Sequence, residues 1–117
     1  DMDDCLFCRI IRGELPSTRV YEDEAVIAIK DLHPVAPVHI LIMPRRHFTD
    51  LNQMAASEEG PTAMTAVLKA VPKVAAATGV LESGYRLINN CGAGAGQTVQ
   101  HVHFHLLGGV KMGEKML

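Results

Sequence analysis

Three histidines alternate with apolar residues in the segment His101-Val102-His103-Phe104-His105. This alternation predicts a β-strand over residues 100–107, because successive side chains of a strand point to opposite faces. All three imidazole rings then share one face of a sheet, with Val102 and Phe104 on the other. Packing alone seldom brings three titratable rings together, so the segment also predicts a functional site.

The other patterns predict one α+β domain over residues 1–117, with a mainly antiparallel sheet and one long helix. The chain has no Trp and only 4% aromatic residues, so its core must be aliphatic. The long helix is expected over residues 61–78, with Pro72 inside it as the point of a kink or break. A short helix or turn is expected over residues 5–12, and residues 49–60 are mostly polar. The predicted strands cover residues 18–21, 25–30, 38–43, 85–90 and 100–107. The nearly all-apolar strand at 38–43 should be central in the sheet.

Charge and cysteine content exclude several classes of protein. The net charge of −2 argues against a general nucleic-acid-binding protein, which needs a basic face to displace counterions. No apolar run approaches the roughly 20 residues that span a bilayer, and no signal peptide is visible. Three cysteines do not make a disulfide framework, and Cys5 and Cys8 have a spacing that suggests metal or redox chemistry. We therefore expect a cytoplasmic protein with no nucleic-acid or membrane partner.

Two kinds of site are compatible with the alternating histidines. Alternate histidines on a strand can share a metal ion. Alternatively, one neutral imidazole attacks a substrate while its neighbours fix its tautomer, since only an unprotonated ring nitrogen is nucleophilic.

The loop at residues 90–98 favours the nucleophile. Its small residues let backbone N–H groups approach an anion, and Gln97 and Thr98 add side-chain donors. The loop is not a P-loop, because no Lys follows its last Gly. It is not a Rossmann fingerprint either, because a strand follows it and its glycine spacing differs. A phosphate-binding loop beside a nucleophilic histidine needs no magnesium, because N–H dipoles and imidazoles meet the charge on the phosphate oxygens.

The segment from His101 to Leu107 also resembles the signature H-φ-H-φ-H-φ-φ (φ, apolar) of the histidine triad superfamily. The resemblance extends over nearly the whole chain. It includes Phe7-Cys8-Arg9-Ile10-Ile11, Val20-Tyr21-Glu22-Asp23, Lys30-Asp31-Leu32, residues 37–44, His47, Gly96-Gln97-Thr98-Val99 and Leu107-Gly108-Gly109. These segments are more similar to the nucleotide-binding branch, which hydrolyses phosphoramidates, than to the branch that hydrolyses diadenosine polyphosphates.

The resemblance implies catalytic roles by matching position. His103 would be the nucleophile that forms a nucleotidyl-histidine intermediate. His105 would hold its ring, and His39 and His101 would complete the cluster. Thr98 stands where the family often has Ser, and its hydroxyl would assist the leaving amine.

The same matching implies contacts to a purine nucleotide. Asp31 would bind the ribose hydroxyls. The phosphate-contacting region matches Asn90, Gly96, Gln97 and Thr98. The apolar walls of the base pocket match Leu6, Phe7, Ile10, Leu15, Ile29 and Leu32, most of which also suit a plain core.

The cysteines resemble a feature of some bacterial histidine triad proteins, in which two N-terminal cysteines bind zinc together with two histidines. The matching residues are Cys5, Cys8, His47 and His101. The alternative is a pair of buried, reduced cysteines on a helix face. A zinc ion held in this way would be structural and would not be the catalytic centre.

We therefore expect an enzyme that cleaves nucleoside phosphoramidates into a nucleoside monophosphate and an amine. Two alternatives stay open: a dinucleoside polyphosphate hydrolase that uses His103, and a non-catalytic nucleotide- or zinc-binding interaction protein. The resemblance also implies a homodimer that joins two sheets. Residues 110–117 lack the tryptophan that many members place against the substrate, so the sequence leaves the substrate preference open.

Overall fold

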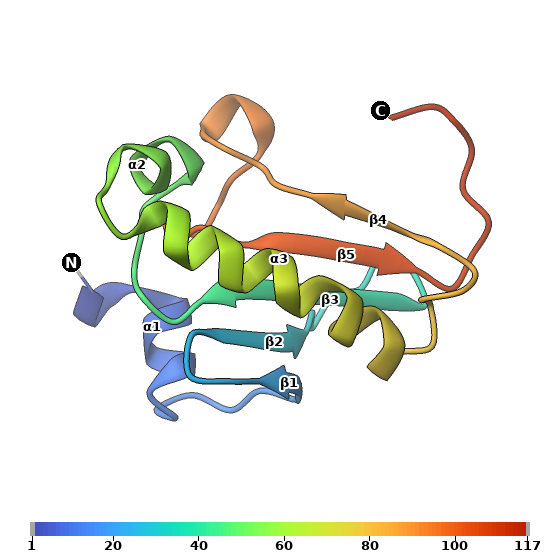
Figure 1. Ribbon diagram of the computed structural model, residues 1–117, viewed down its shortest axis with the longest axis horizontal. Coiled ribbons are helices and arrows are strands. Elements are labelled where there is room, and N and C mark those ends of the chain that lie inside the picture. Colours follow the sequence, from blue (N-terminus) through green and yellow to red (C-terminus); the bar gives the residue numbers. More distant parts are fainter. Residues whose placement is uncertain (1, 117) are drawn as a thin grey trace.

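A five-stranded antiparallel sheet forms the centre of the computed structural model, which describes residues 2–116 (Figure 1). Its strand order is β1-β2-β3-β5-β4. The strands are β1 (Arg19–Glu22), β2 (Val26–Lys30), β3 (Val38–Pro44), β4 (Tyr85–Ile88) and β5 (Phe104–Gly108). The helices are α1 (Leu6–Ile11), α2 (Leu51–Ala56) and α3 (Gly60–Ala77), with 3₁₀ turns η1 (Met2–Asp4) and η2 (Ala93–Ala95). The predicted α+β fold, with a mainly antiparallel sheet and one long helix, is confirmed.

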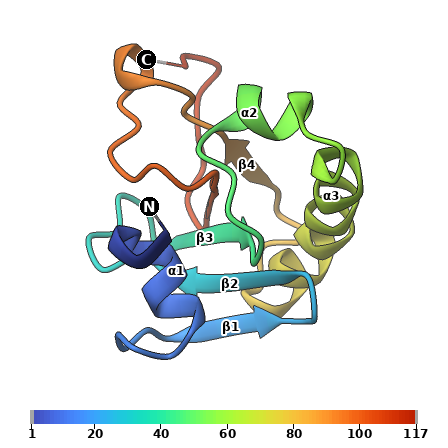
Figure 2. The ribbon, with the colours of Figure 1, turned by 90° about the vertical axis from the view of Figure 1, so that its left-hand side faces the viewer.

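The central strands divide their side chains between two apolar layers. Ile40 and Ile42 of β3 pack in the layer under α3, whereas Leu41 and Met43 pack in the layer with α1. Figure 2 shows α1 and α3 on opposite sides of the sheet. Because β3 is covered on both faces, it has the continuous apolar run that led us to expect a central strand.

Helix α3 runs unbroken from Gly60 to Ala77, so the helix predicted over residues 61–78 is confirmed within one residue at each end. Of the kink or break predicted at Pro72, the break is absent, because the helix continues through this residue. Pro72 has no N–H for the carbonyl of Leu68, but both residues lie on the exposed face, where water can bond that carbonyl. No helix within residues 2–116, α3 included, is long and apolar enough to cross a membrane.

Helix α2 lies in the polar stretch at residues 49–60, for which no helix was predicted. Asp50 caps its first turn, since the Asp50 carboxylate accepts the N–H of Gln53 at 2.8 Å. The Gln53 side chain in turn accepts the N–H of Thr49 at 2.9 Å. This arrangement resembles a capping box, so Asp50-Leu51-Asn52-Gln53 is a helix-start signal that was present in the sequence.

Strand β5 begins at Phe104, four residues later than the predicted start at residue 100. The β3–β5 register pairs Ile42 with Phe104, so its continuation would bring Pro44 opposite Val102. Pro44 has no N–H to donate to a sheet ladder. The N–H of Val102 instead donates to the carbonyl of Phe48 at 2.7 Å. Strand β4 also ends earlier than predicted, at Ile88 instead of residue 90. Ile88 pairs with His105 of β5.

Candidate active site and metal centre

The alternation of side chains continues through residues 101–103 although they precede the hydrogen-bonded strand. Val102 joins Phe104 and Leu106 in the buried layer under α3. The imidazoles of His101, His103 and His105 lie on the opposite face, where those of His101 and His103 contact Phe7 of α1. His101 is fully buried, His103 is 7% exposed and His105 is partly exposed.

A hydrogen bond determines which ring nitrogen of His103 carries the proton. Nδ1 lies 2.8 Å from the carbonyl oxygen of His101. A carbonyl only accepts hydrogen bonds, so Nδ1 carries the proton and Nε2 keeps its lone pair. The ring of Phe7 packs edge-on against His103, with 4.9 Å between ring centroids. Burial lowers the pKa of His103, which favours the neutral ring, against a smaller opposing effect of the hydrogen bond to His101.

The neighbouring His105 is held in the opposite tautomer. The backbone N–H of Val35 donates to Nδ1 of His39 at 3.1 Å, so the proton of His39 lies on Nε2. That Nε2–H donates to Nδ1 of His105 at 2.9 Å. The remaining proton of His105 therefore lies on its Nε2. His103 and His105, with ring centroids 5.2 Å apart, thus present a lone pair and a donor side by side.

Asp31 lies at the other side of His39, with Oδ2 3.4 Å from Nε2 of His39. Its second oxygen accepts the N–H of His33 at 2.7 Å. Asp31, His39 and His105 are close enough together to hold a metal ion. However, Nε2 of His39 carries a proton in this network, so these three residues are poorly suited to one.

The residues predicted to wall a base pocket fall into two groups. Phe7, Ile10 and Ile29 are buried in the apolar layer between α1 and the sheet, with Leu15 packed against them. The second group is exposed: Leu32, in the loop that follows β2, is 85% exposed, and Leu6, the first residue of α1, is 46% exposed. That loop also carries Asp31, so Leu32 lies next to the predicted ribose contact. Their contacts with a nucleotide stay predictions.

The loop at residues 90–98 is held together by Gln97, whose side chain is buried. Its oxygen accepts the N–H of Gly92 at 2.8 Å, and its amide nitrogen donates to the carbonyls of Thr49 and Val99. Gly96 has a φ of +82°, a backbone conformation that favours glycine. Gln97 thus shapes the loop, whereas Thr98 is exposed and Asn90 is partly exposed. Their predicted phosphate contacts stay predictions.

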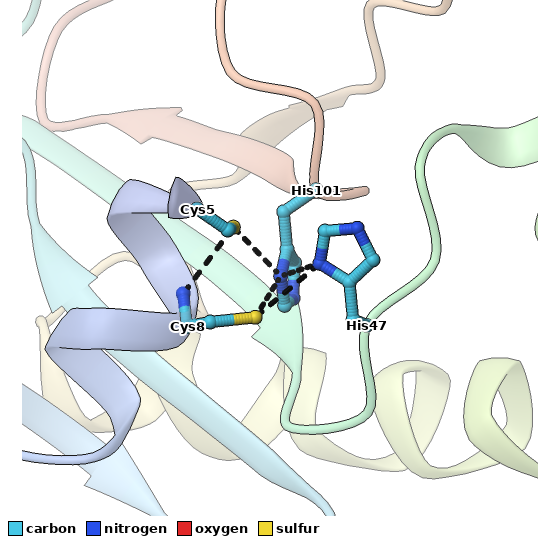
Figure 3. Close-up of side chains that lie close together, drawn as sticks. All are labelled: Cys5, Cys8, His47 and His101. Carbon is cyan, nitrogen blue, oxygen red and sulfur yellow. Dashed lines mark hydrogen bonds between the residues drawn. The ribbon is translucent and has the colours of Figure 1, made fainter. Parts of the chain in front are cut away.

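The four residues of the predicted metal site meet at the start of α1 (Figure 3). Nδ1 of His101 lies 3.6 Å from Sγ of Cys5, 3.5 Å from Sγ of Cys8 and 3.2 Å from Nδ1 of His47. Sγ of Cys8 lies 3.3 Å from Nδ1 of His47. A tetrahedral zinc site with ordinary Zn–S and Zn–N bond lengths has edges of about 3.3–3.8 Å. The spacing of these side chains therefore fits a tetrahedral metal ion.

The ring of His101 is in the protonation state that a metal ligand needs, whereas the buried thiols need a cation in order to ionise. Nε2–H of His101 donates to the carbonyl of Pro44 at 2.8 Å, which leaves Nδ1 free to be a ligand. Burial lowers the pKa of His101 to about 4, so its ring is neutral. Burial raises the pKa of Cys8 to about 11, and the adjacent Cys5 adds to this shift. A metal ion supplies the positive charge that two neighbouring thiolates need.

One residue that contacts the central histidine was not predicted. The side-chain amide of Asn89 donates to the carbonyl of His103 at 2.9 Å. The sequence analysis named only its neighbour Asn90, and for a different role, contact with a phosphate. Asn89 makes this contact because the β4–β5 ladder ends just before it. The end of the ladder depends on pairing between distant segments, which cannot be inferred from the residues around Asn89.

We predict that the pKa of the His103 ring lies below 6.5, the ordinary value for histidine, because burial disfavours the charged form. The ring is then still neutral at pH 6.5, and the lone pair on Nε2 is protonated only when the pH falls to the lowered pKa. Titration of the ring ¹⁵N resonances by NMR measures this, with His103→Ala used to assign the signal. A midpoint at or above pH 6.5 would contradict the prediction.

The chain is similar in sequence and fold to known proteins. A family model described as HIT domain matches residues 12–112. A purine nucleoside phosphoramidase from Escherichia coli (strain K12) is 41% identical over 111 residues, which cover 95% of this chain and 92% of that protein. A 14 kDa zinc-binding protein from Zea mays is 46% identical over 107 residues, which cover 92% and 83%. A solved HIT family hydrolase from Clostridium thermocellum matches with a TM-score of 0.92 at 54% identity, covering 98% of both chains. The resemblance to the histidine triad proteins is confirmed, and the chain belongs to the HIT domain family.

Proposed function

We propose that this chain hydrolyses nucleoside phosphoramidates, with His103 as the nucleophile. The observation that carries the proposal is the tautomer of His103, in which Nδ1–H donates to the carbonyl of His101 and Nε2 keeps its lone pair. The names of two similar proteins support it, since one is a purine nucleoside phosphoramidase and the other a HIT family hydrolase.

In the first step, Nε2 of His103 attacks the α-phosphorus as the bond from phosphorus to the amine nitrogen breaks. A neutral imidazole avoids the repulsion that an anionic nucleophile meets at a phosphate. Nε2–H of His105 donates to a phosphoryl oxygen as negative charge develops there. The amine takes a proton from the hydroxyl of Thr98, which recovers one from water. The product is a nucleotidyl-histidine, whose positive ring is stabilised by the carbonyl of His101.

In the second step, a water molecule attacks the phosphorus and the bond to Nε2 of His103 breaks. The nucleoside monophosphate leaves, the proton of the water goes to solvent, and the ring returns to its neutral form. In this cycle the only side chain that becomes charged is His103, and it is neutral again at the end.

The nucleoside is bound at the other end of the site. The carboxylate of Asp31 is partly exposed and suits two hydroxyl donors of a ribose. A purine base then packs against the layer formed by Phe7, Ile10 and Ile29, and covers the exposed Leu32. The loop at residues 90–98 flanks the phosphate.

We also propose that Cys5, Cys8, His47 and His101 hold one structural zinc ion. The donor set is two thiols and two imidazole Nδ1 atoms, and their spacing fits a tetrahedron. The similarity to a 14 kDa zinc-binding protein supports this choice of metal. When bound, the ion supplies positive charge that keeps the thiols deprotonated. The zinc ion takes no part in the proposed reaction, which the histidines and Thr98 carry out.

We further propose that the chain forms a homodimer through β4 and the exposed face of α3. β4 is an edge strand, and its Leu87 pairs with Leu106, whose side chain packs under α3. Tyr85 and Leu87 therefore point to the α3 side of the sheet, where they are 37% and 38% exposed. Leu68 on α3 is 64% exposed. An uncovered edge with apolar side chains favours pairing with a second chain.

We predict that His103→Ala lowers the turnover of an adenosine phosphoramidate with a fluorescent amine by about 10⁴-fold, because the nucleophile is lost. Binding of AMP, measured by calorimetry, should survive. His33→Ala is the matched control, since His33 is exposed and outside the cluster. Equal turnover in His103→Ala would exclude His103 as the nucleophile. Nucleotide binding without turnover by the native chain would favour the interaction protein. Faster cleavage of a dinucleoside polyphosphate would favour the other hydrolase branch.

We predict that metal analysis of the purified chain gives about one zinc per chain, and that Cys5→Ser loses it. Removal of the metal with a chelator should lower the temperature of unfolding, because the ion joins α1 to the segment before β5. Cys91→Ser is the control, since Cys91 lies outside the cluster. Native protein purified without chelators that contains no zinc would contradict the zinc site.

We predict that sedimentation at micromolar concentration gives twice the chain mass of 12.7 kDa. Leu87→Glu should shift the protein to the monomer, because it places a charge in the proposed interface. Val35→Glu, which changes another exposed apolar side chain, should leave the dimer intact. A native monomer at this concentration would overturn the proposed dimer.

A further inference from the structure

The three residues that carry and precede the nucleophile lie outside both ladders that flank β5. The β3–β5 pairing ends at Phe104 and the β4–β5 pairing ends at His105. Backbone groups buried beyond the end of a ladder need other partners. The carbonyl of His101 accepts from the ring of His103, and the N–H of Val102 donates to Phe48. The carbonyl of His103 accepts from a side chain, that of Asn89.

Asn89 follows directly on Ile88, the last residue of β4 that pairs with β5. At this point the side chain replaces the backbone as the donor to the neighbouring segment. Its amide nitrogen lies 2.9 Å from the carbonyl oxygen of His103. Because a carbonyl only accepts, the NH₂ group must face His103 and the amide oxygen must point away.

The amide oxygen of Asn89 is buried and has no hydrogen-bond partner among residues 2–116. An unpaired buried acceptor destabilises a fold, and an apolar side chain of similar size would avoid that cost. The donor half of the amide is used and the acceptor half is not. This asymmetry indicates that the contact with His103 is what the amide contributes.

We propose that Asn89 is a positioning residue for the nucleophile. The amide of Asn89 fixes the peptide group that follows His103, while the carbonyl of His101 fixes the ring. Together these two hydrogen bonds determine where Nε2 of His103 points. Asn89 acts through His103 and does not touch the substrate. The kinetic part of the inference rests on the proposed phosphoramidate hydrolysis, but the geometric part does not.

The main test is Asn89→Leu, which keeps the approximate size of the side chain and removes the donor. We expect kcat for an adenosine phosphoramidate to fall by about 10-fold to 100-fold, because small misplacements of a reacting atom are costly. KM and the affinity for AMP should change by less than about 2-fold, since Asn89 is not among the proposed nucleotide contacts. Asn52→Leu on the exposed face of α2 is the matched surface control.

A second readout does not depend on activity. In the native protein, the ¹⁵N resonances of His103 should report a proton on Nδ1 and a lone pair on Nε2. In Asn89→Leu they should report a mixture of the two tautomers. If the native chain has no phosphoramidase activity, the proposed function fails, but the NMR result still decides whether Asn89 holds His103.

A matched pair of smaller variants covers the case in which Asn89→Leu does not fold. Asn89→Ser keeps a hydroxyl donor, which a water molecule can connect to the carbonyl of His103, whereas Asn89→Ala has none. We expect kcat of Asn89→Ser to exceed that of Asn89→Ala by several-fold at equal unfolding temperature and equal zinc content. Native kcat and an unchanged His103 tautomer in Asn89→Leu, or equal values in the Ser and Ala variants, would overturn the proposal.

Discussion

The hydrogen bond from Nδ1 of His103 to the carbonyl of His101, 2.8 Å long, determines what the rest of the site can do. With the opposite tautomer, the ring would direct a proton at an incoming phosphorus and could not attack it. The adjacent His105 is set the other way, through His39, by the backbone N–H of Val35. One backbone carbonyl and one backbone amide thus give two neighbouring imidazoles opposite roles, without any buried charged side chain.

The two faces of the sheet make such a site compatible with a small fold. Val102, Phe104 and Leu106 pack in the aliphatic layer under α3, which includes the fully buried Val67 and Val74. That layer fixes the backbone from which the histidines project to the other side. The polar rings therefore need not contribute to the main core. Each ring forms a hydrogen bond to a backbone group or to another ring, which compensates for the loss of hydrogen bonds to water on burial.

Local periodicity predicted much of this arrangement, and pairing between distant segments explains the rest. The alternation at residues 101–105 predicted which side chains share a face, because the period of two belongs to the backbone. It did not predict that the ladder stops at Phe104, since that depends on Pro44 lying opposite Val102. The contact of Asn89 with the carbonyl of His103 depends in the same way on where β4 ends. Helix α2 differs from these cases, because its Asp50 and Gln53 cap was a local signal.

His101 belongs to both candidate sites, the proposed zinc site and the histidine cluster. Its Nδ1 faces Cys5, Cys8 and His47, and its Nε2–H donates to Pro44. Its backbone carbonyl accepts from Nδ1–H of His103, the proposed nucleophile. The residue is fully buried, and both ring nitrogens have partners, so its backbone has little freedom to move independently of the cluster. The position of the acceptor that orients His103 is therefore determined by the cluster on one side. On the other side it is determined by Pro44, the same residue that ends the β-ladder.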